Sequence, residues 1–213
     1  MVLNRFSPLT ARQAIDQALE AVDAARAHQG PCKNAAGAAA TALDGCEEDI
    51  TAIKFDRPER DVSANGRAIR TRGGKSLVHE REAKGHQDAI GSETVRIDDG
   101  IKQALVGVGL TSKARFQLEE ATRDLDFMKS HDIKALESDL RIGARNIGPE
   151  LDPFLREVES DAPGRDVGRF AEDIKRQVGD GNLNFREAGL AAGWVLKDLN
   201  SIQGHLELAR QSL

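Results

Sequence analysis

The last thirty residues carry the feature that most constrains the fold, an apolar seam that steps alternately four and three residues along the chain. This spacing of 3.5 residues places the whole seam on one side of an α-helix, as in a coiled coil. The sequence predicts one helix over 184–213, about 45 Å long at roughly 1.5 Å per residue. Because so long an apolar seam is unfavourable in water, the rest of the chain or a second copy must cover it. The seam residues are Ala188, Ala192, Val195, Leu199, Ile202, Leu206, Ala209 and Leu213.

The composition favours helices over sheets. Of 213 residues, 39% are hydrophobic and 31% are charged, whereas only 4% are aromatic. Strands usually draw on aromatic residues, so a β-sandwich or β-barrel is disfavoured. With seven or eight expected helical segments, the sequence predicts an all-α fold. We expect an elongated helical bundle with a long C-terminal heptad-patterned helix and a flexible or small hairpin-containing central segment.

The net charge of −5 argues against binding to nucleic acid or to an anionic membrane. No apolar run is long enough to span a bilayer, so no transmembrane segment is expected. The first residues lack the apolar core of a secretory signal. We therefore expect a cytoplasmic protein, and export by a signal-independent route stays open.

The first 55 residues predict an N-terminal helical hairpin. Thr10 and Gln13 form a capping-box pattern at the start of the first helix. Gly30-Pro31 is typical of a helix stop. A second helix is expected from Asn34 to just before Pro58. The short connection would make the two helices antiparallel.

Residues 56–91 lose this periodicity and mix charges of both signs with scattered glycines. Two interpretations stay open. Asn65-Gly66 and Gly73-Gly74 could turn two short strands into a hairpin, or the segment could be a mobile linker. We favour the linker.

Residues 92–213 predict a helical bundle, and the whole chain is expected to be one domain. Helices are expected over 92–108 and from Ser112 onward, with a slip in the rhythm at 129–132. Asp132 would fall in the seam there, so the slip is either a helix break capped by Asp132 or a stutter. Gly148-Pro149 predicts another stop, and Gly179-Asp180-Gly181 predicts a turn before the last helix.

The stretch from Asp180 to Glu187 offers weak candidates for metal ligands: Asp180, Asn182, Asn184 and Glu187. It resembles the second half of an EF-hand calcium loop, which carries an acidic residue, a glycine, an apolar residue and a final glutamate at this spacing. Arg176 and Val178 stand where that family supplies oxygen ligands. The simpler interpretation is a turn followed by a helix cap, with Asn184 as the cap and Glu187 returning the bond.

No catalytic residues and no cofactor are predicted. Cys32 and Cys46 are too few for a disulfide framework or a zinc site. The five histidines show no metal-binding spacing along a helix. A basic cluster made of Arg67, Arg70, Arg72 and Lys75 has no interleaved aromatic residue and is interpreted as a solvated loop.

The function predicted from these patterns is a non-enzymatic helical interaction or assembly protein: structural, adaptor, or secreted and apparatus-associated. The partner, or a second copy, would bind the C-terminal helix at Ile202, Leu206, Ala209 and Leu213. Trp194 lies one step off the seam and is expected to pack under a neighbouring helix. Two alternatives are a calcium-responsive module at 180–187 and an enzyme with a cryptic site that uses His131, Asp132 or other distant polar residues.

Overall fold

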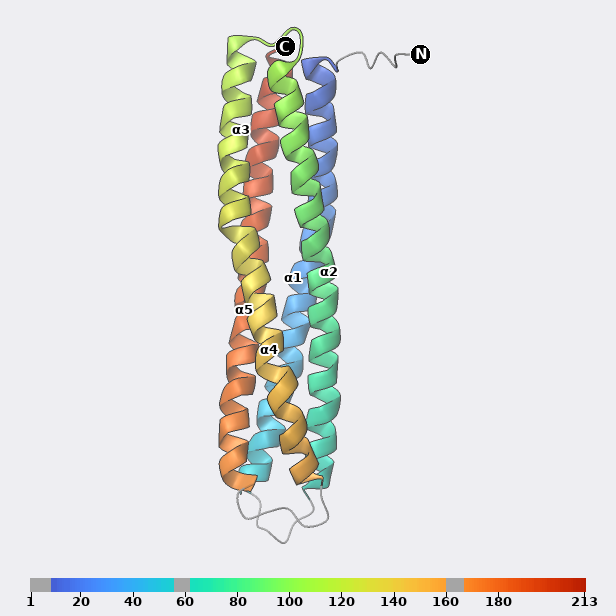
Figure 1. Cartoon of the computed structure of the whole chain (residues 1–213), viewed down its shortest axis with the longest axis vertical. Helices are drawn as coiled ribbons and strands as arrows, with labels where there is room; N and C mark the ends of the chain where they lie inside the picture. Colours follow the sequence, from blue (N-terminus) through green and yellow to red (C-terminus); the bar gives the residue numbers. More distant parts are fainter. Residues whose placement is uncertain (1–8, 56–61, 160–166) are drawn as a thin grey trace, which may run out of the picture. The chain divides into compact units, whose positions relative to one another are not determined.

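A computed structural model describes residues 9–55, 62–159 and 167–213, and the regular structure in these ranges is helical (Figure 1). This confirms the all-α fold and the long C-terminal helix. Apart from an isolated bridge between Thr10 and Val108, the described residues contain no β-pairing. Within the same ranges, no helix contains an apolar stretch that could span a lipid bilayer. The helices are α1 (Ala11–Phe55), α2 (Ser63–Val106), α3 (Ser112–Ser130), α4 (Asp132–Val158) and α5 (Val167–Gln211).

The chain divides into two compact units. Unit 1 comprises Met1–Gly30, His86–Lys134 and Ala192–Leu213, and unit 2 comprises Pro31–Gly85 and Ala135–Ala191. Each unit contains a segment of α1, of α2 and of α5. Unit 1 also contains α3, and unit 2 also contains most of α4. The prediction of a single domain stays a prediction.

Unit 1 is a four-helix antiparallel bundle. The pairs Asp16 with Arg210 and Arg26 with Asn200 run in opposite order along α1 and α5. Near the C-terminus, the Thr111 hydroxyl donates to the carbonyl of Ser212 over 2.8 Å, so the start of α3 meets the end of α5. The green end of α2 lies beside the blue start of α1 in Figure 1, and a Cβ on Gly100 would come within 2.8 Å of the Ala18 Cβ.

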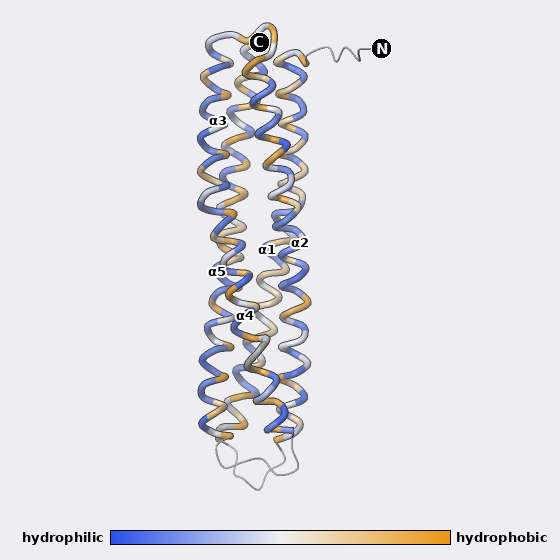
Figure 2. Tube along the Cα trace, viewed as in Figure 1, coloured by the Kyte–Doolittle hydropathy of each residue, from blue (hydrophilic) through white to orange (hydrophobic). Residues whose placement is uncertain are grey.

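Unit 2 has the same design with α4 in place of α3. Cys46 Sγ contacts the carbonyl of Ile69 and the Ser76 hydroxyl donates to the carbonyl of Ala39, which makes α1 and α2 antiparallel. On the other side, α4 packs against α5, where a Cβ on Gly143 would come within 2.7 Å of the Phe185 ring. Orange hydrophobic positions recur at short intervals along the helices in Figure 2, as expected for helices with one buried face.

The prediction of an N-terminal helical hairpin is wrong, because α1 is one helix with Pro31 inside it. The capping box at its start is confirmed. The backbone N–H of Gln13 donates to Thr10 Oγ1 over 3.2 Å, and the backbone N–H of Thr10 donates to Gln13 Oε1 over 3.0 Å. Proline removes one helical hydrogen bond and costs about 3 kcal/mol. Packing outweighs this cost because buried residues continue through the proline without a change in rhythm: Ala18, Val22, Ala25, Gln29, Cys32, Ala36 and Ala39.

The prediction of a linker or strand hairpin at 56–91 is also wrong where the structure describes it, since α2 covers Ser63–Val106. Residues 56–61 lie outside the described residues. A heptad seam runs through α2, but small and polar residues occupy much of it, so hydropathy alone does not reveal it. The buried positions of α2 are Gly66, Ile69, Gly73, Ser76, Glu80, Ala83, Gln87, Ile90, Thr94, Ile97, Gly100, Ile101 and Ala104, and Val62 is buried just before the helix.

Two of these glycines are explained by close approach of α4. A Cβ on Gly73 would lie 2.7 Å from the Leu151 Cδ2, and one on Gly66 would lie 3.0 Å from the Val158 Cγ1. Large side chains of α4 thus fill the space that the glycines of α2 leave open. This complementarity compensates for the low helix propensity of glycine.

Two later stop signals are also overridden, because helix packing outweighs the low helix propensity of glycine and proline. α4 continues past Gly148-Pro149 to Val158, and α5 continues through Gly179-Asp180-Gly181. Gly181 lies in the buried seam, where a Cβ would meet Ile147 at 3.2 Å. The slip at 129–132 is a real helix break: α3 ends at Ser130, His131 is its C-cap, and α4 begins with a buried Asp132.

The helical assignment of the former linker can be tested with Gly85→Ala. A Cβ at Gly85 meets nothing within 4 Å. We expect Gly85→Ala to raise the free energy of unfolding by about 0.5–1 kcal/mol, because alanine favours the helix and loses less chain entropy. Urea denaturation followed by circular dichroism measures the change.

Gly100→Ala on the same helix is the matched control. Its Cβ would lie 2.8 Å from the Ala18 Cβ and 3.0 Å from the carbonyl oxygen of Ala14, so this change should destabilise the protein. A neutral or destabilising Gly85→Ala would contradict the helical assignment of this segment.

Candidate functional site

The four metal-ligand candidates lie within α5, so the EF-hand loop and the helix cap predicted for 180–187 are both wrong. An EF-hand loop bends around its ion, whereas a helical backbone carries successive side chains to different sides. The Asn184 side chain donates to the carbonyl of Asp180 over 2.7 Å, one helical turn earlier. Glu187 lies near Asp139, whose pKa is raised by burial and by this second carboxylate. The described residues contain no group of three or more His, Cys, Asp or Glu side chains arranged to hold a metal ion.

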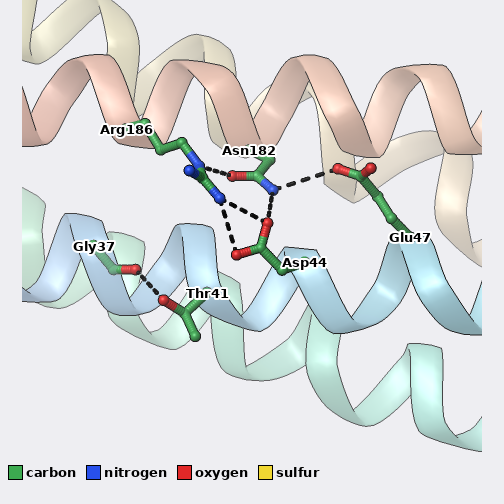
Figure 3. Close-up of polar contacts among 6 residues, drawn as sticks. All are labelled: Gly37, Thr41, Asp44, Glu47, Asn182 and Arg186. Carbon is green, nitrogen blue, oxygen red and sulfur yellow. Dashed lines mark hydrogen bonds and ion pairs between the residues drawn. The ribbon is translucent and has the colours of Figure 1, made fainter.

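Asn182 belongs instead to a polar network in unit 2, formed by Asp44, Glu47, Asn182 and Arg186 (Figure 3). The buried Asn182 amide donates to Asp44 over 2.6 Å and to Glu47 over 3.4 Å. Its carbonyl oxygen accepts from Arg186 Nε over 2.9 Å, and Arg186 Nη2 reaches both oxygens of Asp44 at 2.9 and 3.0 Å.

The polar network joins α1 to α5, and its polar side-chain atoms hydrogen-bond to one another. Asn182 uses its side-chain amide hydrogens and its carbonyl oxygen inside the network, and a single nitrogen of Arg186, Nη2, bonds to both oxygens of the Asp44 carboxylate. Such a network fixes the register between two helices whose alanine-rich faces would otherwise slide. The sequence pattern identified Asn182 as notable, but only the fold reveals Asp44 and Glu47 as its partners.

A second polar group, the acid cluster of Asp124, Asp132 and Asp198, lies in unit 1 beside the α3–α4 break. Burial raises the pKa of Asp198 to about 7, and a hydrogen bond with Asp132 and repulsion from Asp132 and Asp124 act in the same direction. Lys197 acts in the opposite direction. The raised pKa means that Asp198 keeps its proton to a higher pH than an ordinary aspartate.

Ser201 and His205 adjoin the acid cluster but do not form a nucleophilic relay. The Ser201 hydroxyl donates to Asp124 over 2.6 Å, and Nε2 of His205 lies 3.5 Å from the same carboxylate. The other ring nitrogen hydrogen-bonds to Gln117 over 2.8 Å. In a serine relay the histidine must accept the serine proton, whereas here the carboxylate accepts it.

Three of the four predicted interaction residues are covered by the chain itself. Ile202, Leu206 and Ala209 are fully buried in unit 1, and Leu213 is partly exposed. The prediction that they form the partner surface is therefore corrected. Their period marks the face of α5 that packs inside unit 1.

Large apolar side chains are exposed on two neighbouring helices of unit 1. Phe116 and Phe127 on α3 are 53% and 52% exposed, and Trp194 and Leu208 on α5 are 53% and 46% exposed. We call these the α3 row and the α5 row. The prediction that Trp194 packs under a neighbouring helix is wrong. The sequence signal that identifies both rows is large apolar residues spaced whole turns apart but outside the seam.

The two cysteines and two arginines of the basic cluster are engaged in packing or ion pairs. Cys32 and Cys46 are buried, and burial raises their pKa to about 11 and about 12, which keeps both as thiols. The basic cluster lies on α2 rather than on a loop, and Arg70 pairs with Glu159 at 3.0 Å while Arg72 pairs with Asp49 at 3.1 Å. A shallow cavity of about 510 Å³ beside it is lined by Ala42, Arg67, Ala68, Thr71, Arg72 and Lys75.

Comparison with protein-family models, with curated proteins and with solved structures gives no match for this chain.

The polar network predicts that Asn182→Ala lowers the free energy of unfolding by about 1–2 kcal/mol, because buried hydrogen bonds to Asp44, Glu47 and Arg186 are lost. Chemical denaturation measures the change. Asn184→Ala is the matched control, two residues along the same helix, and should change stability by no more than about 0.5 kcal/mol. A larger effect at Asn184 than at Asn182 would favour the cap over the network.

The acid cluster predicts a specific pH dependence of stability. The folded-state pKa of Asp198 is raised to about 7, well above that of an unfolded aspartate. Protonated Asp198 therefore adds to the free energy of unfolding in acid, and this stabilisation is lost as pH rises from about 4 to 7. Asp198→Asn mimics the protonated acid and should remove this loss. Relative to the native chain, we expect the variant to gain about 1–2 kcal/mol between pH 5 and pH 8, since a tenfold change in proton affinity is about 1.4 kcal/mol.

Unfolding free energies of both chains across this pH range provide the measurement. Asp88→Asn, at an exposed position on α2, is the control and should follow the native curve. Parallel curves for the native chain and Asp198→Asn would show that Asp198 is not held protonated.

Proposed function

We propose that the chain is a non-enzymatic helical interaction protein that self-associates through the α3 row and the α5 row. The observation that carries the proposal is the exposure of Phe116, Phe127 and Trp194, each more than half accessible. Aromatic residues are enriched at protein interfaces and supply much of their binding energy. Only 4% of the residues are aromatic, so three exposed ones in one unit are a notable share.

The spacing of the rows supports a helix-surface interaction. Phe116 and Phe127 are eleven residues apart, which is close to three helical turns, so both point to the same side of α3. Trp194 and Leu208 are fourteen residues apart, with Ser201 midway between them, and share one side of α5. Ser201 donates to Asp124 of α3, so the α5 row borders α3. Two helices of a partner could pack along these rows.

The charges around the rows favour a second copy as the partner. Arg123 on the α3 row pairs with Glu120 at 2.9 Å, and Lys197 beside Trp194 is exposed. A surface with one sign of charge would repel its own copy. This face carries both signs, so a symmetric dimer can place opposite charges together while it buries the aromatic rings.

The exposed rows are different residues from the seam that the sequence predicts as the partner surface. The seam at Ile202, Leu206 and Ala209 is already buried, so separating it for a partner would require opening unit 1. The exposed rows require no such opening. The enzyme alternative stays a prediction, and the calcium alternative loses its motivating loop because that stretch is helical.

Light scattering at increasing protein concentration tests the proposal. The native chain should approach twice its monomer mass, and emission from its single tryptophan, Trp194, should shift to the blue as the ring leaves water. Phe116→Ser with Phe127→Ser should weaken association at least about tenfold, because each buried aromatic contributes on the order of 1–2 kcal/mol.

Val95→Ser is the matched control, since Val95 is 55% exposed on α2 in the same unit but lies outside both rows. It should leave the dissociation constant within about twofold of the native value. A native chain that stays monomeric at every concentration, with unchanged Trp194 emission, would contradict the proposal. So would an equal loss of association in Val95→Ser.

A further inference from the structure

Two histidines from different helices of unit 1 approach each other closely. Nδ1 of His28 on α1 lies 3.1 Å from Nδ1 of His86 on α2. The ring centroids are 5.4 Å apart and the planes are tilted by 39°. Both side chains are half-buried, so solvent still reaches them.

This contact requires the two rings to play different roles. A neutral imidazole nitrogen either carries a hydrogen or offers a lone pair. At 3.1 Å, one Nδ1 donates and the other accepts. The hydrogen can move to Nε2 of the donating ring, and both Nδ1 lone pairs then face the same space without any net gain or loss of protons.

The separation of the two nitrogens suits a transition-metal ion. With metal–nitrogen bonds of about 2.0–2.1 Å, a separation of 3.1 Å gives a nitrogen–metal–nitrogen angle of roughly 100°. This value lies between the right angle of square-planar coordination and the tetrahedral angle, the two geometries that Cu²⁺ and Zn²⁺ adopt. The two helices already hold the nitrogens in place.

We propose that His28 and His86 form a two-histidine site for a divalent first-row transition ion, Zn²⁺ or Cu²⁺, with water in the remaining positions. The ion clamps α1 to α2 within unit 1. Neutral imidazole is a preferred ligand of both ions. The half-buried position allows water to complete the coordination, as two protein ligands require. The site is separate from the rows on α3 and α5.

The other histidines have different surroundings and serve as references. His79 is partly exposed and lies 3.4 Å from Glu82 one turn along α2. His131 stacks on Phe127 with centroids 4.5 Å apart, and His205 hydrogen-bonds to Gln117. None of these three contacts brings a second imidazole nitrogen into reach.

Calorimetric titration of the metal-free chain with Zn²⁺ tests the site. We expect one ion per chain, with binding at least about tenfold weaker in His28→Asn and in His86→Asn, because each variant loses one of the two protein ligands. His79→Asn, on the same helix as His86, should bind like the native chain. Saturating Zn²⁺ should raise the melting temperature of the native chain and of His79→Asn, and not that of the two site variants.

A second measurement identifies the ligands independently of affinity. The electron paramagnetic resonance spectrum of the chain with one equivalent of Cu²⁺ should show coupling to two imidazole nitrogens, and to one fewer in each site variant. Circular dichroism of the metal-free variants confirms that they fold. Absence of binding heat, unchanged binding in the His28→Asn/His86→Asn double variant, or loss of binding in His79→Asn would overturn the proposal.

Discussion

The burial of side chains that alternate four and three residues apart holds the described helices in place. In α1 and α5 the alternating positions are mostly alanine, valine, leucine and isoleucine. Small residues allow helix axes to approach, and the larger ones fill the gaps that remain. Because the buried faces of the described helices pack against other helical segments of the same unit, these helices do not depend on intrinsic propensity alone. This explains how glycines and Pro31 are accommodated within long helices.

Polar residues inside the seams give the packing its specificity. Ser76 donates to the carbonyl of Ala39, Asn182 joins Asp44 and Arg186, and Gln29 donates to the carbonyl of Ala192. An alanine-rich interface alone tolerates sliding by one heptad, whereas a buried donor that loses its acceptor costs on the order of 1–3 kcal/mol. These bonds therefore fix the register within each unit.

The same principle separates structural residues from those available for function. Ile202, Leu206 and Ala209 follow the heptad period and are buried by helix packing within unit 1. Phe116, Phe127 and Trp194 depart from it and remain exposed, although exposure of large aromatic side chains to water is unfavourable. The His28–His86 pair and the acid cluster bring together groups far apart in sequence. Residues that break the packing pattern are the ones from which the functional proposals arise.

The sequence by itself determined the all-α fold, the Thr10–Gln13 capping box and the long C-terminal helix, because these depend on local spacing and on nearest neighbours. It also marked the break near Asp132, where the rhythm slips. It could not reveal that Gly66 and Gly73 face Val158 and Leu151, and so it misassigned α2. The same limitation applies to Pro31 and to Gly181, where stop signals were outweighed by packing. Only the tertiary structure decided those boundaries, the pairing of His28 with His86 and the exposure of Trp194, because each depends on what lies across a helix interface rather than along the chain.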